Sequence, residues 1–174
     1  MKIRIFISLV LLFISTKLSV GAEQNIPRSE IGSVVKDFAK TIGCMMKFDE
    51  TNIVRYEVDG GYDGFGEFVV LYGIDPKCSG GSAMYHSAIA VLERDYRGNI
   101  YIHPGQSFPV NRPNDLPQYV EKIYVENGQL LFKSKEFDSK DGLCCPSLLV
   151  TGRLFMKEGK WFSEIIKSEK NQEK

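Results

Sequence analysis

The first clear pattern in the chain is a run of apolar residues at helical spacing. From Ser29 the apolar positions recur three or four residues apart as far as Ile42, and Gly43 follows them. Residues at this spacing share one face of a helix, and glycine commonly follows a helix end. The pattern therefore predicts one amphipathic helix from Ser29 to Ile42. Its apolar face would be formed by Ile31, Val34, Val35, Phe38 and Ile42.

After this helix the period changes to one that is typical of strands. Short segments rich in Val, Ile and Tyr are separated by turns, including Asn127-Gly128, a dipeptide that favours a tight hairpin. Neighbouring strands joined by short turns form an antiparallel meander. We therefore expect an α+β fold, with the N-terminal helix packed on one meander sheet of seven or eight strands. The expected strands are residues 53–58, 67–74, 87–93, 99–103, 119–126, 129–137, 148–156 and 160–166.

The segment between Pro104 and Pro117 interrupts the strand pattern. It contains four prolines and little periodicity. It is expected to form an ordered surface loop and not a domain boundary.

The chain opens with the features of a secretory signal peptide. Lys2 and Arg4 precede an apolar run from Ile5 to Ile14, and residues 20–22 are small. This run is shorter than the roughly 20 residues that a membrane-spanning helix needs. We expect removal of residues 1–22, which leaves a single globular domain over residues 23–166 and a disordered tail over residues 167–174. The product would be periplasmic or secreted, without stable membrane insertion.

Charge is balanced along the chain, with 22 basic and 22 acidic residues. Residues 1–22 contain three basic residues and no acidic residue, so their removal leaves 19 basic against 22 acidic residues. A nucleic-acid-binding domain usually carries a basic excess. Nucleic acid is therefore not expected as a partner. Lys133, Lys135 and Lys140 are expected to form a solvated face.

Four cysteines are present: Cys44, Cys78, Cys144 and Cys145. In an exported chain they are expected to be oxidised, which would staple the domain with disulfides. Four cysteines allow three pairings. A bridge between adjacent residues closes a strained ring, so we expect Cys144 and Cys145 to bond to different partners, Cys44 and Cys78. The cysteine spacing of a zinc site is missing, and no metal or other cofactor is expected.

An acidic, glycine-rich segment lies between the first two expected strands. Asp59, Asp63 and Glu67 occupy the first, fifth and ninth positions of a calcium-loop pattern, with a glycine at the sixth. Gly61 at the third position offers no side-chain oxygen, and Val70 stands where a bidentate glutamate is usual. A solvated turn is the expected structure. If calcium binds, the ligands would be Asp59, Asp63 and Glu67.

The loop after Cys78 consists of small polar residues and ends with Tyr85. A loop that is tethered by a disulfide and carries an exposed tyrosine can enter the cleft of a partner protein in a preordered conformation. The candidate partner-binding residues are Ser79, Gly80, Ser82 and Tyr85.

The same loop allows a hydrolase interpretation. Ser82 lies four residues before His86, one of the chain's two histidines, the other being His103. However, Met84 occupies the last glycine position of the Gly-x-Ser-x-Gly elbow that presents a serine nucleophile. No catalytic residue is therefore assigned.

Several of these motifs occur in the same order in a loose group of uncharacterised exported bacterial proteins and lipoproteins, which this chain resembles over residues 58–82 and 141–161. The matching features are the acidic glycine turn, the strand 67–72, the Cys78 loop and Cys144-Cys145-Pro146-Ser147 before a hairpin. Gly61 departs from the usual acidic turn of that group. The Ser79-Gly80 loop followed by Tyr85 is also slightly similar to the loop of periplasmic lysozyme inhibitors, with a longer spacing. The resemblance implies an exported domain with bridging cysteines and implies no activity.

These observations favour an exported binding or inhibitory module without catalytic activity, such as an inhibitor or immunity protein. Its partner would be a protein of the cell envelope, either an enzyme or a toxin. A calcium- or small-solute-binding envelope protein is the alternative, and a small hydrolase is a second alternative.

Overall fold

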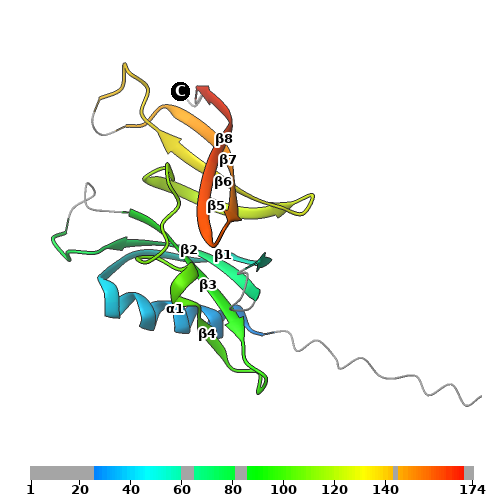
Figure 1. Cartoon of the computed structure of the whole chain (residues 1–174). Helices are drawn as coiled ribbons and strands as arrows, with labels where there is room; N and C mark the ends of the chain where they lie inside the picture. The colour runs from blue at the N-terminus through cyan, green and yellow to red at the C-terminus, as the bar shows by residue number, and fades with distance from the viewer. Residues whose placement is uncertain (1–25, 60–64, 81–85, 143–144, 171–174) are drawn as a thin grey trace, which may run out of the picture.

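The computed structural model describes residues 26–59, 65–80, 86–142 and 145–170. Within these ranges the chain forms a helix, eight strands and a short 3-10 helix (Figure 1). In chain order the elements are α1 (Arg28–Ile42), β1 (Cys44–Asp59), β2 (Phe65–Asp75), β3 (His86–Arg94), β4 (Ile100–Ile102), η3 (Pro104–Gln106), β5 (Tyr119–Glu126), β6 (Gln129–Glu136), β7 (Leu148–Lys157) and β8 (Lys160–Lys170).

The strands form two stacked antiparallel sheets, so the expected single sheet is wrong. Their orders are β1-β2-β3-β4 and β5-β6-β7-β8, and α1 covers the face of the first sheet that points away from the second (Figure 1). The α+β class, the antiparallel pairing and the presence of a disulfide are confirmed. Six consecutive residues of β3, Ser87–Leu92, are buried. Such a strand needs cover on both faces, and the helix and the second sheet supply it.

Two apolar cores follow from this arrangement. One lies between the sheets and contains Val69 and Leu71 of β2 with Phe132 and Trp161 of the second sheet. The other lies under α1 and contains the alternate β2 residues Val70 and Tyr72. Alternation along β2 therefore serves both cores, because successive strand side chains point to opposite faces.

β1 begins directly after the helix and is much longer than the expected strand 53–58. It pairs with β2 from Cys44 to Asp59, with a register shift between Phe48 and Ile53. The extra residues of this bulge break the apolar alternation, which is why the sequence pattern did not reveal the first half of the strand.

The bulge carries a polar connection between the two sheets. The buried Asn52 side chain donates from Nδ2 to the carbonyl of Glu121 over 3.1 Å and accepts the N–H of Ile123 over 3.0 Å. Ser87 of β3 likewise donates to the carbonyl of Gln118 and accepts the N–H of Val120. The edge of β5 that faces the first sheet is thereby capped by side chains instead of by another strand.

The segment between β4 and β5 is not a surface loop throughout, contrary to expectation. Gln106, Ser107 and Asn111 are buried. The Trp161 indole N–H donates to the carbonyl of Gln106 over 2.8 Å, and the Trp161 backbone N–H donates to Oδ1 of Asn111 over 3.0 Å. The segment is therefore packed against β8 and joins the two sheets.

The end of the chain also differs from the prediction. β8 extends to Lys170, so residues 167–170 belong to a strand and not to a disordered tail. Residues 171–174 lie outside the described ranges, as do residues 1–25, which contain the expected signal peptide.

Candidate functional site

The loop after β2 is exposed and tied to the start of β1. Residues 76–80 are all exposed, whereas Asp75 at the end of β2 is buried. A disulfide joins Cys78 of this loop to Cys44, the first residue of β1. The tether reinforces the register of the two strands, because Cys44 is paired with Asp75 across the sheet.

The carboxylate of Asp75 fixes the loop from inside. Its Oδ1 accepts the N–H of Lys77 and its Oδ2 accepts the N–H of Gly80, both over 2.9 Å. The Asp75 backbone carbonyl also accepts the N–H of Cys78 over 3.2 Å. The side chain is 0% exposed, so these bonds form away from competing water. The first turn of the loop is thus held by a hydrogen-bond network and a covalent bridge together.

Protonation of Asp75 is opposed by this network. Burial alone raises the pKa of the carboxyl, but the hydrogen bonds from the backbone of residues 77–80 together outweigh burial and hold the pKa below its usual value of 3.8. A carboxylate that accepts several backbone N–H groups is stabilised in its charged form. The loop anchor is therefore ionised at neutral pH.

Two positions at this loop require glycine, one for its backbone conformation and one for close packing. Gly80 has a φ of 75°, a left-handed conformation that glycine adopts without strain. Gly43 packs so closely that a Cβ there would lie 2.7 Å from the carbonyl oxygen of Asp75 and 2.8 Å from Cα of Pro76. A larger residue at Gly43 would push the loop away from the helix end.

The predicted partner-binding residues are only partly described. Ser79 and Gly80 are exposed in the tethered loop. Ser82 and Tyr85 lie outside the described residues. Sequence reasoning missed Asp75, although an aspartate whose side chain bonds the backbone two residues later is a recognised turn signal.

The predicted cysteine pairing is wrong. Cys44 bonds to Cys78, so neither of them can bond to Cys144 or Cys145. Cys145 is also disulfide-bonded, and Cys144 lies outside the described residues. The prediction failed because it placed Cys44 at a helix end and did not recognise that β1 begins there, beside the end of β2.

A second loop, before β7, is organised by an aspartate in the same way. Oδ2 of Asp141 accepts the N–H groups of Asp138 and Ser147 over 2.7 and 2.8 Å. Asp138 also pairs with Lys170 of β8 over 3.1 Å. Bonds from Ser147 and Asp138 lower the pKa of Asp141. This loop lies at the same end of the molecule as the Cys78 loop (Figure 1).

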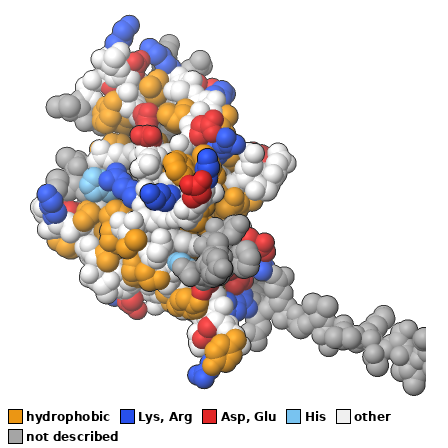
Figure 2. Space-filling model, viewed as in Figure 1, with side chains coloured by type: hydrophobic (Ala, Val, Ile, Leu, Met, Phe, Trp, Pro, Cys, Tyr) orange, Lys and Arg blue, Asp and Glu red, His pale blue; other side chains and the backbone are white. Residues whose placement is uncertain are grey.

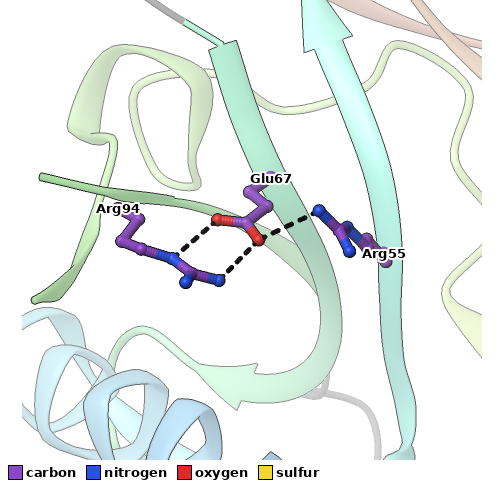
Figure 3. Close-up of polar contacts among 3 residues, drawn as sticks. All are labelled: Arg55, Glu67 and Arg94. Carbon is purple, nitrogen blue, oxygen red and sulfur yellow. Dashed lines mark hydrogen bonds and ion pairs between the residues drawn. The ribbon is translucent and has the colours of Figure 1, made fainter. Parts of the chain in front are cut away.

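Glu67, one of the three possible calcium ligands, is engaged by two arginines (Figure 3). Arg94 donates to both of its carboxylate oxygens, over 2.8 and 3.2 Å, and Arg55 lies 3.4 Å from one of them. The Glu67 side chain is 18% exposed. A cation at this carboxylate would have to compete with the guanidinium groups.

The rest of the possible calcium site is not described. Asp63 lies outside the described residues, and only the backbone of Asp59 is described, as the last residue of β1. Within the part of the chain that the structure describes, no group of three or more His, Cys, Asp or Glu residues is arranged to hold a metal ion.

A small cavity lies beside the β1 bulge. Its lining includes Asp49, Asn52 and Tyr72, and its volume is about 10 Å³. This is space for about one water molecule. The cavity is too small for an organic solute.

The two histidines do not approach each other. His86 pairs with Ile74 at the start of β3, whereas the N–H of His103 bonds to the carbonyl of Val91, five residues further along that strand. A strand rises by about 3.3 Å per residue, so the two positions are roughly 17 Å apart. Ser82 lies outside the described residues, so the Ser82–His86 pair of the hydrolase interpretation has no described geometry.

Among the described residues no helix is long and apolar enough to span a membrane. Comparison of the chain with protein-family models, with curated proteins and with solved structures found no match in any of the three.

Proposed function

We propose that this chain is an exported binding or inhibitory module, and that the exposed loop over residues 76–80 contacts a protein partner. The observation that carries the proposal is that a buried carboxylate and a disulfide fix a segment that is itself exposed. Asp75 contributes its hydrogen bonds to the loop backbone, and the loop residues 76–80 are exposed, not packed into either core. The order of this loop is not required to bury apolar surface.

A rigid loop binds a partner at a lower entropic cost than a flexible loop. A flexible loop loses conformational entropy when a partner immobilises it, whereas a loop that is already held in one conformation loses little. Exposed binding residues on a rigid scaffold are a common arrangement in proteins whose loops carry function.

The composition of the loop suits a protein partner. Ser79 and Gly80 are small, so a partner can approach the backbone closely, and Lys77 offers a positive charge. Extracytoplasmic location is part of the proposal, because the N-terminal segment has signal-peptide features and a disulfide persists best in an oxidising compartment. An envelope enzyme or toxin is the class of partner that we propose.

The test is an affinity capture from envelope extract with the oxidised chain lacking residues 1–22, followed by binding of the purified captured protein. Ser79→Glu places a charged side chain on the exposed loop without removing a described hydrogen bond of that residue. Ser33→Glu, the same substitution at an exposed position of α1, is the matched control.

We expect one protein to bind the native chain and the Ser33→Glu variant equally. Its affinity for Ser79→Glu should be at least about tenfold lower, which corresponds to the loss of a contact worth about 1.4 kcal/mol. Equal binding of that protein to all three chains would place its contact elsewhere and refute the role of the loop. Failure of the native chain to retain any protein specifically would count against a protein partner.

A further inference from the structure

The outer face of the second sheet carries a row of lysines that the register brings together. Lys122 of β5 is paired with Lys133 of β6, which is paired with Thr151 of β7, which in turn is paired with Lys167 of β8. Paired residues of an antiparallel sheet point to the same face. Ile123 follows Lys122 on β5 and Phe132 precedes Lys133 on β6, and both belong to the core between the sheets. Because successive strand side chains point to opposite faces, the lysine row points away from that core.

The lysines of this row differ in their charge partners. Lys167 pairs with Glu169 over 2.7 Å. In contrast, within the described ranges neither Lys122 nor Lys133 has a carboxylate at ion-pair distance. The Lys133 ammonium lies 5.9 Å from the centre of the Tyr124 ring.

Two unpaired lysines directly opposite each other are unfavourable. Like charges at paired positions of a sheet repel and destabilise it by a few tenths of a kcal/mol or more. Asp49 lies close enough for Lys122 to lower the pKa of Asp49 slightly, but the hydrogen bonds from Thr51 are the larger cause of that shift. A bound anion between Lys122 and Lys133 would replace repulsion by attraction.

We propose that this lysine row, Lys122, Lys133 and Lys167, binds a linear acidic polysaccharide through its carboxylates. Neighbouring strands are about 4.8 Å apart, so Lys122 and Lys133 lie one strand spacing apart and Lys167 lies two spacings beyond Lys133, with Thr151 between them. A polymer with one carboxylate on each sugar matches such a row. The Thr151 hydroxyl lies in the middle of the row, where it can donate to a sugar oxygen.

The charge distribution favours a polymer that is less densely charged than a nucleic-acid duplex. Acidic and basic side chains are interspersed on the face seen in Figure 2, and the whole chain has 22 of each. On the second sheet, Glu121, Glu164 and Glu169 already pair with Lys135, Arg153 and Lys167. A dense phosphate backbone needs a broader basic surface than this row.

The test uses purified polygalacturonate, titrated by calorimetry at several salt concentrations into the native chain, Lys122→Glu/Lys133→Glu and the control Lys36→Glu/Lys47→Glu. The two variants have the same net charge, and the control lysines lie on α1 and β1. We expect the row variant to bind at least about tenfold more weakly than the control, with a salt slope smaller by about two, one for each lost charge contact.

A structural role alone predicts a different result. If Lys122 merely maintained the sheet, the single variant Lys122→Glu would unfold more easily than the native chain. We expect Lys122→Glu to raise or preserve the melting temperature, because it creates an opposite-charge pair with Lys133, while it weakens polygalacturonate binding.

Three outcomes would overturn the proposal. They are equal loss of affinity in the row and control variants, no binding of polygalacturonate by the native chain at low salt, and tighter binding of a single-stranded oligonucleotide than of polygalacturonate at the same salt. None of these outcomes bears on the Cys78 loop, so the proposed function is tested separately.

Discussion

At the residue scale, three loops are ordered by hydrogen bonds from their backbone N–H groups to an aspartate side chain. Asp75 and Asp141 each accept two backbone N–H groups of their own loop, and Asp95 does the same in the turn between β3 and β4. In each case the pKa lies below its usual value because hydrogen bonds favour the charged form. Asp75 differs from the others because it is completely buried.

Asp75→Asn tests the anchor with little change of shape. The amide can accept through only one oxygen, so one of the bonds to Lys77 and Gly80 is lost. We expect the backbone amide that loses its bond, that of Lys77 or of Gly80, to exchange its hydrogen roughly three- to tenfold faster, which is the equivalent of one net hydrogen bond. In the native chain the same protection should fade as the pH falls below 3.8 and through the depressed pKa of Asp75, because ionisation of this group stabilises the folded state. Unchanged exchange in the variant would mean that Asp75 does not hold the loop.

A glycine in β7 gives a second prediction at this scale. A Cβ on Gly152 would lie 2.3 Å from the Phe132 ring and 2.6 Å from the carbonyl oxygen of Glu164. We expect Gly152→Ala to reduce the free energy of unfolding by about 1–3 kcal/mol through overpacking. Gly142→Ala is the control, because among the described residues no heavy atom beyond its immediate chain neighbours lies within 4 Å of a Cβ at that position. Equal stability of the two variants in urea unfolding would contradict the close packing of β7 on Phe132.

At the scale of elements, the two sheets are joined by side-chain hydrogen bonds as well as by the core between them. The Asn52 amide imitates the backbone of a neighbouring strand at the edge of β5, and Ser87 adds a similar connection. Because this edge is occupied, another chain cannot pair with it there.

Asn52→Ala should therefore weaken the contact between the sheets. It leaves the N–H of Ile123 and the carbonyl of Glu121 without their partner, and we expect a loss of about 1–3 kcal/mol in the free energy of unfolding. Asn99→Ala, which removes an exposed hydrogen bond to Asp95, should cost much less. Urea denaturation of both variants measures the difference, and a comparable loss would argue against a special role for Asn52.

The sequence pattern predicted some elements better than their arrangement. The apolar spacing after Ser29 and the turn dipeptides were local signals, and α1 and the hairpins β5–β6 and β7–β8 lie where those signals stand. The first half of β1 escaped notice because a bulge removes the alternation there. The division into two sheets was also missed, because the sequence does not show which strands pair in space. It also does not show that Gln106, Ser107 and Asn111, in the segment that follows β4 and precedes β5, are buried.

At the scale of the whole molecule, the Cys44–Cys78 disulfide and two apolar cores stabilise the described part of the fold. The Cys44–Cys78 bridge spans 34 residues of sequence, and it connects the helix end to the candidate binding loop. The sequence allowed three pairings and favoured bonds from Cys144 and Cys145 to Cys44 and Cys78. That prediction was wrong because the sequence does not reveal the register that sets Cys44 beside Asp75.

Peptide mapping of the oxidised chain should recover Cys44 linked to Cys78 and should recover no peptide that links Cys145 to either of them. Cys44→Ser/Cys78→Ser should keep the strand content of the native chain while losing about 3–4 kcal/mol of stability, as the loop-closure model gives for a bridge of this span. Recovery of a Cys44–Cys145 or Cys78–Cys145 link would contradict the fold at the candidate site.

The most direct test of the central claim is the mobility of the loop in solution. Backbone ¹⁵N relaxation of the oxidised chain should give Lys77 and Gly80 order parameters of about 0.85, equal to those of the neighbouring strands β2 and β3. This result would establish a binding loop that is rigid before any partner arrives. Order parameters below about 0.6 at these two residues would contradict the account, because the loop would then be flexible and not preformed.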